Sequence, residues 1–514
     1  MARIRIPGFI VLAAAIGVAI VQLLPIDPGV RFFTSFSITG LGVIALALWL
    51  LVFSGWRWSA RLGVLAGTAA IAAGLVWAFE LEIEFDGEMN PMFHAGRRSL
   101  FRQALDQHRS GRPRAASAAV PDATDDDFPE YRHRRRDGVL PHVRWLTDWD
   151  AHPPKPVWRQ PCGGGFAGFA VVGPLAVTIE QRGDNEAVTA YDVETGQERW
   201  VHEYPAHFRE PLGGNGPRAT PTIADGTVYS VGAAGHFVSL DAATGTLRWQ
   251  IELLADNANL TWGQCGSPLV IGESVIVTPG AQTPAAAGRA VRAYDRATGR
   301  LIWASGSRKA GYSSPQLSTL CGVTQIVLLD GQAVAGYDPE TGAELWSYDW
   351  PTYQDINVAQ PLVLDGDRVF VSSGYGHGGA MLQVSRADGK WKVEPLWSNT
   401  NLRCKFSSPV FRDGYIYGLD EAHLVCLDAA SGARKWKGDR YGFGQILLAG
   451  DAVLVGAENG RLALVAATPE RFREIAVIRA LSGDKNWNHL AVSRGRAFLR
   501  NHFEMACYQL PMPD

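Results

Sequence analysis

A phrase of eleven residues recurs five times between residues 190 and 436, and it constrains the fold more than any other feature of the sequence. In every copy a glycine follows an aspartate by four residues, and a tryptophan follows that aspartate by eight. Successive copies start about 40 to 55 residues apart, or twice that where one copy is missing, which is the spacing of β-propeller blades. The five sets are Asp192, Gly196 and Trp200; Asp241, Gly245 and Trp249; Asp295, Gly299 and Trp303; Asp338, Gly342 and Trp346; and Asp428, Gly432 and Trp436.

Each copy is typical of a strand, a tight turn and a second strand. The aspartate can accept a hydrogen bond from the backbone two residues on, and the glycine supplies a left-handed turn position. A four-stranded blade cannot bury both of its faces alone, so a closed ring of blades is the stable arrangement. The residues of the phrase are therefore predicted to dock one blade on another and not to catalyse a reaction.

The number of blades follows from repeated strand starts. Eight short segments of similar pattern are each predicted to open the inner strand of a blade, and they begin at Gly168, Thr220, Ser267, Ser314, Gln360, Ser408, Gln445 and His489. The fifth blade lacks the phrase and has a displaced Trp397, and the eighth ends near Leu510 before any outer strand. We expect residues 156–159 to supply that strand, with Trp158 docking, because joining both ends of the chain removes open sheet edges. The predicted fold is all-β, an eight-bladed propeller over residues 151–514.

The first 80 residues are of a different kind. Three uncharged apolar runs, at about 7–25, 36–55 and 62–79, are each long enough for a helix to cross the hydrocarbon core of a bilayer. A cleaved signal peptide would explain the first run and not the other two. Arg3 and Arg5 precede the first run, and Arg57 and Arg61 lie between the second and third. The positive-inside rule then predicts a cytoplasmic N-terminus in a bacterial inner membrane, with the propeller in the periplasm.

Residues 81–150 join the two parts and are predicted to be a tether and lead-in. A short helix is expected over 97–109. The basic run 132–136 is able to contact lipid headgroups, but a solvated loop is the expected state.

Charge and cysteine usage exclude several classes of function. A net charge of −3 argues against nucleic acid as a partner. The six cysteines include no CxxC, no adjacent pair and no CxxCH haem site, so they are expected to pack as small apolar side chains.

The recurring phrase resembles the tryptophan-docking motif of the pyrroloquinoline quinone (PQQ) repeat family. In that family the tryptophan of one blade packs on the glycine and the small first residue of a neighbouring blade. The lead-in also resembles that of membrane-anchored, planctomycete-type PQQ-like propeller proteins, through Phe128, Tyr131, the run 136–139, Trp149 and Trp158. The family's usual first tryptophan is Phe128 here, and its Gly-Pro pair is replaced by His133-Arg134.

This resemblance implies two classes of function. One is a BamB-like propeller without enzymatic activity, which binds a protein partner or a ligand as a scaffold. The other is a quinoprotein dehydrogenase that oxidises alcohols or sugars with PQQ and Ca²⁺. The phrase is common to both, whereas the lack of an adjacent cysteine pair and of a haem site favours the scaffold. No catalytic or metal-ligating residue is assigned.

Candidate ligand-binding residues come from the segments that enter the inner strands. If these segments face one mouth of the ring, they form a funnel of mixed charge that is able to bind a carboxylate-rich ligand, PQQ included. The alternative is that these groups only satisfy backbone and water, as in any propeller. The candidates are Arg182, Arg218, Trp262, Lys405 and Asn488.

Overall fold

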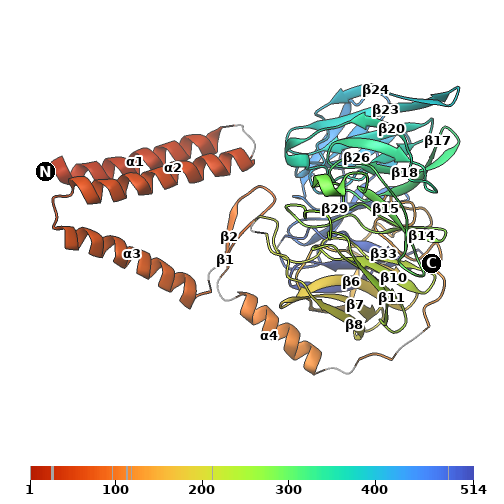
Figure 1. Cartoon of the computed structure of the whole chain (residues 1–514), viewed down its shortest axis with the longest axis horizontal. Coiled ribbons are helices and arrows are strands. Elements are labelled where there is room, and N and C mark those ends of the chain that lie inside the picture. Colours follow the sequence, from red (N-terminus) through yellow and green to blue (C-terminus); the bar gives the residue numbers. More distant parts are fainter. Residues whose placement is uncertain are drawn as a thin grey trace. The chain divides into compact units, whose positions relative to one another are not determined.

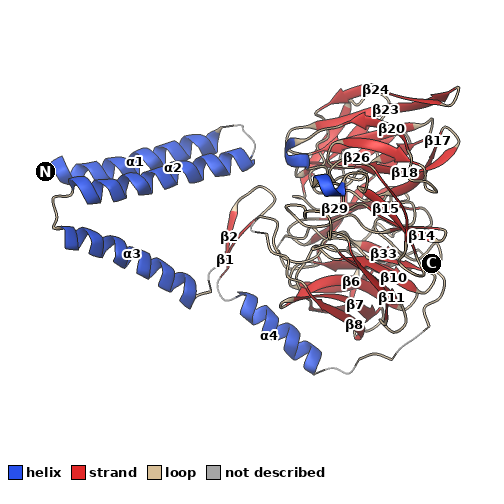
Figure 2. Ribbon diagram, in the orientation of Figure 1, coloured by secondary structure: helices blue, strands red, loops and turns tan. Residues whose placement is uncertain are grey.

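The computed structural model describes residues 2–24, 28–80, 82–94, 97–111, 114–116, 119–210, 212–483 and 485–513. Its contacts divide the chain into two compact units, residues 1–100 with 211–213, and residues 101–210 with 214–514. Helices dominate the first unit and strands the second (Figure 1, Figure 2). Pro25, the last residue of the first expected span, lies outside the described residues.

Three long apolar helices occupy the N-terminal part, as predicted. They are α1 (Ala2–Leu23), α2 (Pro28–Leu48), which continues into the π-helical turn η1 (Trp49–Phe53), and α3 (Trp58–Ala78). Their segments Ile6–Leu23, Val30–Phe53 and Trp58–Ala78 have the length and composition needed to cross a membrane. Their apolar side chains are almost all unburied by the rest of the protein, which fits a lipid surrounding.

A short hairpin and a helix follow. The strands β1 (Glu82–Phe85) and β2 (Pro91–His94) pair antiparallel. The helix α4 (Arg97–Ser110) confirms the helix predicted over 97–109. The second half of α4 contacts the propeller, because Arg109 donates to Glu203 at 3.2 Å and the Phe101 ring stacks on Phe503 with centroids 4.2 Å apart.

Eight antiparallel four-stranded blades form the propeller, which confirms the predicted fold. Blades 1 to 4 are β5–β8 (Ala170–Val172, Leu175–Arg182, Asn185–Asp192, Glu198–Pro205), β9–β12 (Thr222–Ala224, Thr227–Val231, His236–Asp241, Leu247–Glu252), β13–β16 (Leu269–Ile271, Ser274–Val277, Val291–Asp295, Leu301–Ser305) and β17–β20 (Gln316–Leu320, Val323–Leu329, Ala333–Tyr337, Glu344–Asp349). The short 3-10 helices η2 (Pro284–Ala286) and η3 (Tyr353–Asp355) lie in loops.

The second half of the ring repeats this order. Blades 5 to 7 are β21–β24 (Leu362–Leu364, Arg368–Ser373, Gly378–Ala387, Lys390–Asn399), β25–β28 (Val410–Arg412, Tyr415–Asp420, His423–Asp428, Arg434–Arg440) and β29–β32 (Gln445–Ala449, Ala452–Gly456, Arg461–Ala466, Glu474–Arg479). Blade 8 has β33 (Ala491–Ser493), β34 (Arg496–Arg500), β35 (Glu504–Gln509) and β4 (Lys155–Pro161).

Both ends of the propeller sequence share blade 8. The strand β4 pairs antiparallel with β35, and Trp158 lies opposite Cys507. This confirms the closure predicted for residues 156–159, and it leaves no blade short of its outer strand.

The docking turns are built by the aspartates of the phrase. Asp192 Oδ1 accepts from the backbone N–H groups of Glu194 and Thr195 and from the Thr195 hydroxyl. Burial alone would raise the pKa of Asp192, but these hydrogen bonds hold it below its ordinary value. The same turn recurs at Asp241, Asp295, Asp338 and Asp428.

With the exception of Trp346, the indoles of these tryptophans dock on the next blade. A side-chain carbon at position 245 would lie 2.5 Å from the Trp200 ring, so glycine, here at φ +71°, is what permits the approach. The Trp200 indole also donates to the Ala242 carbonyl oxygen at 2.8 Å. The same arrangement recurs for Trp158 on Gly196, Trp249 on Gly299, Trp303 on Gly342 and Trp397 on Gly432. Trp436 donates to the Thr468 carbonyl oxygen of blade 7.

Trp346 departs from this pattern. Blade 5 lacks the phrase, and a side-chain carbon added at Gly389 in its own turn would have nothing within 4 Å, so Trp346 does not dock on that turn. The Trp346 ring instead covers Gly336 of its own blade, and its indole donates to Gln325 Oε1 at 2.5 Å. The displaced Trp397 then restores docking on blade 6.

The basic run in the lead-in corrects one prediction. A solvated loop was expected at 132–136, but Arg132 and Arg136 are buried, with 0% and 1% of their surface exposed. Arg132 donates to the carbonyl oxygens of Ser408 and Pro409, and Arg136 donates to those of Ser267, Pro268 and Pro315. Carbonyl oxygens at the starts of the inner strands, and for Arg136 also the Glu130 carboxylate at 2.7 Å, replace water around these two guanidinium groups. Arg132 and Arg136 are therefore buried, whereas Arg134 and Arg135 between them are exposed.

The neighbouring residues of the lead-in also bind inner strands. Phe128 forms a β-bridge with Val171 of blade 1, and the Pro129 carbonyl oxygen accepts from Ile223 N of blade 2. The short strand β3 (Val139–Leu140) adds to β29 of blade 7 in parallel. Residues 127–140, which we call the axial segment, therefore contact the inner strands of blades 1, 2, 3, 4, 6 and 7, and they must cross the centre of the ring.

Candidate ligand-binding mouth

The inner strands all begin at one end of the ring. Hydrogen bonds link the starts of neighbouring strands, from Gly168 N to Thr220 Oγ1, from Ser267 N to Ser314 Oγ, and from Gln360 N to Ser408 Oγ. We call this end the mouth.

The residue two positions before each strand start faces the mouth. At this position seven of the eight residues are partly exposed, whereas the residue that follows is buried in seven of eight blades. The ring around the mouth is therefore formed by Phe166, Arg218, Cys265, Tyr312, Val358, Phe406, Phe443 and Trp487.

Arg218 supplies a cation to this ring. Its guanidinium lies over the rings of Phe208 and Phe166, 4.6 and 5.5 Å from their centroids, and donates to the Gly214 and Gly216 carbonyl oxygens. Burial lowers the pKa of Arg218, but an arginine remains protonated in any such setting. Within the described residues no carboxylate forms an ion pair with Arg218, so its charge is balanced only at longer range.

Lys405 brings a second cation close to the ring. Only 5% of its surface is exposed, and its ammonium lies 4.6 Å from the ring centroids of Tyr375 and Phe443 and 5.4 Å from that of Phe406. Aromatic faces attract a cation more strongly when water is displaced. The rings therefore hold the ammonium in place beside the mouth.

Aromatic side chains from four successive blades are in contact. The Trp487 ring stacks on Phe166 at 5.2 Å and lies 4.9 Å from Phe406, which in turn contacts Phe443 at 5.4 Å. The Trp487 indole donates to Glu458 Oε1 at 2.7 Å. Blades 6, 7, 8 and 1 thus present one aromatic arc, next to the cations Arg218 and Lys405.

Trp262 lies on the opposite, more polar arc. Its ring meets Tyr312 edge to face at 5.7 Å. A side-chain carbon at the adjacent position 263 would lie 3.1 Å from Phe208, the ring that covers Arg218. The structure thus brings three of the five sequence candidates, Arg218, Trp262 and Lys405, to the mouth.

Asn488 follows the ring residue Trp487 in the sequence and supports the ring. Its amide nitrogen donates to the carbonyl oxygens of Gly165 and Ala167, at 3.1 and 2.9 Å, and only 6% of its surface is exposed. Asn488 therefore positions the backbone that carries Phe166.

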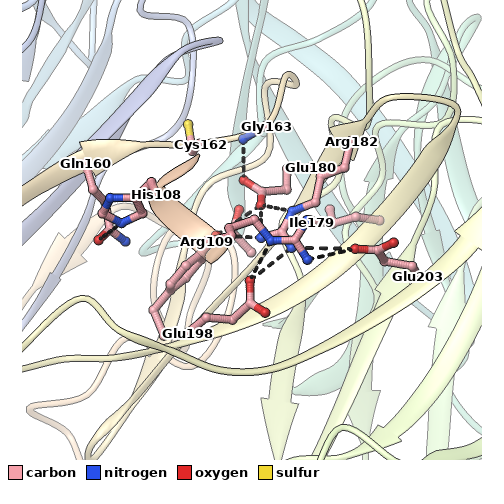
Figure 3. A network of polar contacts seen from close by, with 12 residues as sticks. His108, Arg109, Gln160, Cys162, Gly163, Ile179, Glu180, Arg182, Glu198 and Glu203 are labelled. Carbon is pink, nitrogen blue, oxygen red and sulfur yellow. Dashed lines mark hydrogen bonds and ion pairs between the residues drawn. The ribbon is translucent and has the colours of Figure 1, made fainter. Parts of the chain in front are cut away.

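Arg182 is placed differently from the other candidates, in a network of charges (Figure 3). It forms ion pairs with Glu180 at 2.5 Å and with Glu198 at 2.9 Å, and Arg109 of α4 lies 3.5 Å from the same Glu198. Burial alone would lower the pKa of Arg182, but these carboxylates raise it well above its ordinary value. The guanidinium is thus engaged by protein carboxylates and joins α4 to blade 1.

Burial and nearby charges shift the pKa values of two residues close to Arg218. Burial and the nearby cations Lys485, Arg218 and Arg500 hold the pKa of His502 well below its usual range, so this imidazole is neutral beside Phe166. Burial also raises the pKa of Glu186, which acts on Arg218, to about 7. Near Arg218 the imidazole is therefore neutral, and burial weakens the ionisation of the Glu186 carboxyl group.

The residue set does not fit a Ca²⁺ ion. Calcium requires six to eight oxygen ligands, several of them carboxylates. Among the described residues no group of three or more His, Cys, Asp or Glu side chains is placed to hold a metal ion. The aromatic rings and the cations of the mouth suit PQQ, which is planar and carries carboxylates, but they provide no oxygen ligands for the metal.

Comparisons with known proteins agree with this architecture. A family profile described as "Outer membrane protein assembly factor BamB" matches residues 184–438. No curated protein sequence matches the chain. The quinohemoprotein alcohol dehydrogenase ADHIIG from Pseudomonas putida HK5 is 13% identical with a TM-score of 0.55, covering 77% of this chain and 84% of its own. The quinohemoprotein alcohol dehydrogenase from Comamonas testosteroni is 13% identical with a TM-score of 0.53, covering 82% and 86%. BamB from Moraxella catarrhalis is 16% identical with a TM-score of 0.49, covering 70% and 98%.

The matched region contains all five docking phrases in full. The profile match and the five docking phrases support a PQQ-like β-propeller family for this chain. At identities this low, the likeness to the two alcohol dehydrogenases shows the fold alone.

Several residues of this PQQ-like propeller's mouth were missed from the sequence. They are Phe166, Phe208, Tyr375, Phe406 and Phe443, all of which contact a cation. A signal was present for three of them, because Phe166, Phe406 and Phe443 each stand two residues before a predicted strand start. Aligning the eight starts and reading that one column would have identified the aromatic arc.

Proposed function

We propose that this chain is a membrane-anchored scaffold of the bacterial inner membrane whose periplasmic propeller binds an anionic ligand, or an acidic segment of a protein partner, at the mouth. The positive-inside distribution of Arg3, Arg5, Arg57 and Arg61 supports a cytoplasmic N-terminus and a periplasmic propeller. Three apolar helices support integral attachment.

One observation carries the proposal: Arg218 is held between two aromatic rings without a carboxylate ion pair in the described part of the chain. A guanidinium in this state gains a charge-assisted hydrogen bond when a carboxylate or phosphate arrives. Lys405 adds a second positive charge, and the arc around Trp487 offers flat apolar contact. The matching ligand carries negative charge at one side and an apolar face at the other.

A PQQ-dependent dehydrogenase is the second candidate. The aromatic arc beside Arg218 and Lys405 favours it, since PQQ is a planar polycarboxylate. When bound, PQQ would accept two electrons from an alcohol or a sugar. Within the described part of the chain no set of carboxylates is placed to hold Ca²⁺, which counts against this candidate.

Titration of the purified full-length protein with PQQ, in EDTA and then in Ca²⁺, separates the candidates. We expect binding that does not need Ca²⁺, weakens with salt, and falls about ten- to a hundredfold in Arg218→Gln or Lys405→Met, since each removes one charge-assisted contact. Arg300→Gln, at an exposed position in a docking turn, is the control and should bind as wild type.

Two outcomes would contradict the scaffold. Ca²⁺-dependent reduction of a dye by an alcohol or sugar, lost in Lys405→Met, would establish the dehydrogenase. Binding that is equally strong in Arg218→Gln, Lys405→Met and the control would show that anions do not bind at the mouth.

A further inference from the structure

A hollow lies at the seam between blades 7 and 8. Its volume is about 280 Å³, part of which is open to solvent. Backbone turns of blade 7 and apolar side chains form much of its wall, and three buried polar side chains, those of Asn486, Asn488 and Arg500, complete it. The apolar part of the wall includes Leu481, Leu490 and Leu499.

Two of the polar atoms at this hollow have no protein partner. Asn488 Oδ1 and Arg500 Nε are buried, and neither has a hydrogen-bond partner within the described residues. Their side chains are 6% and 2% exposed. A buried donor or acceptor left unpaired costs about 1–3 kcal/mol, so two of them at one hollow require an explanation.

Neither side chain can turn to find another partner. Asn488 is fixed by the hydrogen bonds from its amide nitrogen to Gly165 and Ala167. Arg500 donates from Nη1 to Thr178 Oγ1 at 2.8 Å and from Nη2 to the Gly163 carbonyl oxygen at 2.8 Å. The free acceptor and the free donor are therefore held in place.

The chemistry of Asn488 Oδ1 and Arg500 Nε together selects the ligand. The Arg500 guanidinium repels a cation, and the Asn488 carbonyl oxygen repels an anion. An apolar group would leave both atoms unpaired. A hydroxyl group is neutral and both donates and accepts, so it satisfies both atoms at once.

We propose that this hollow binds a hydroxyl group, either an ordered water molecule or the hydroxyl of a small alcohol or polyol. The hollow is partly open to solvent, so a hydroxyl group can enter it. The bound hydroxyl bridges Asn488, which holds the backbone on both sides of Phe166, to Arg500, which holds Gly163. It thereby fixes the loop 163–167 and with it one aromatic residue of the mouth.

Crystals of the full-length protein in detergent test this site, with electron-density maps that resolve ordered solvent. We expect density within about 3.2 Å of both Asn488 Oδ1 and Arg500 Nε. A compact peak identifies water, and extended density identifies an alcohol or polyol. Crystals under xenon pressure and crystals soaked in bromide report on an apolar and an anionic occupant of the same hollow.

A second hollow in the same crystals is a matched control. It has a volume of about 260 Å³ and is lined by Arg308, Asp330 and Tyr337, among others. Within the described residues none of the buried side-chain polar atoms around it is unpaired. Xenon or bromide between blades 7 and 8, no density there at all, or density that is equally ordered in both hollows would overturn the proposal.

Discussion

Arg132 Nη2 donates to the carbonyl oxygen of Pro409, 277 residues further along the chain, at 2.7 Å. The donor belongs to the axial segment and the acceptor to the entry of blade 6. Arg136 makes the equivalent contacts with blades 3 and 4. Each inner strand normally contacts only its two neighbours, so the axial segment links blade 6 with blades 3 and 4 across the ring.

Removing one of these contacts should destabilise the ring. Arg132→Met leaves the Ser408 and Pro409 carbonyl oxygens without their buried donor, and we expect the free energy of unfolding to fall by about 3 kcal/mol. Arg135→Met is the control, because Arg135 is exposed and its one ion pair is with Asp137 at 3.1 Å. Chemical denaturation measures both, and equal stability of the two variants would show that the axial segment does not brace the ring.

Docking tryptophans should contribute more than exposed apolar residues of the same strands. Trp200→Ala removes a buried indole and its bond to Ala242, so we expect a loss of about 3–5 kcal/mol. Gly245→Ala should also destabilise, since the added carbon would meet the Trp200 ring. Leu301→Ala, at a 38% exposed position, is the control. Melting temperatures of Trp200→Ala and Leu301→Ala that match wild type would contradict docking.

Glu186 should make stability depend on pH. Burial raises the pKa of Glu186 to about 7 from an ordinary value of 4.5, and its carboxyl accepts from the Tyr204 hydroxyl and from Ala233 N. The folded protein therefore retains a proton that the unfolded chain loses. This contribution is fully present below pH 4.5 and is lost as the pH rises through 7.

Glu186→Gln should remove that dependence. Its free energy of unfolding, relative to wild type, should rise by on the order of 3 kcal/mol between pH 5 and 8. Glu340→Gln, at an exposed position, is the control and should follow wild type at every pH. A difference between Glu186→Gln and wild type that stays constant with pH would show that Glu186 is ionised throughout.

The orientation of the membrane helices is open to a direct test. Alkaline phosphatase fused after residue 90 should be active, and a fluorescent protein at the same point should be dark when exported in unfolded form. The reason is that the arginines beside the helices favour a cytoplasmic N-terminus. Exchanging Arg57 and Arg61 for glutamine should weaken the bias, while the same exchange at Arg102 in α4 should not. The reverse pattern of reporter activity would place the propeller in the cytoplasm.

Repetition made most of the fold predictable. The positions of Trp200, Trp249 and Trp303 follow from a local turn that the phrase itself encodes, and the closing strand at Trp158 follows from a missing blade edge. Trp346 shows the limit of this reasoning. Its own phrase is intact, but docking depends on the turn of the next blade, and blade 5 has no copy of the phrase to form that turn.

The candidate site was only partly predictable for a similar reason. In the sequence the three candidate cations have similar positions, because Arg182 ends a strand and Arg218 and Lys405 precede strands. Glu180 and Glu198 engage Arg182, whereas aromatic rings surround Arg218 and Lys405. Which partner a cation meets depends on side chains from other blades, and a linear pattern does not contain that information.

Local chemistry repeated along the chain therefore determined the blade, the number of blades, their closure and the three apolar helices. Tertiary structure alone decided where the charges of the lead-in go. From its sequence the run 132–136 has the composition of a solvated loop, yet Arg132 and Arg136 are buried. The reason is physical: a guanidinium can leave water only if enough acceptors converge on it, and here the carbonyl oxygens of Ser267, Pro315, Ser408 and Pro409 converge only when the ring has closed.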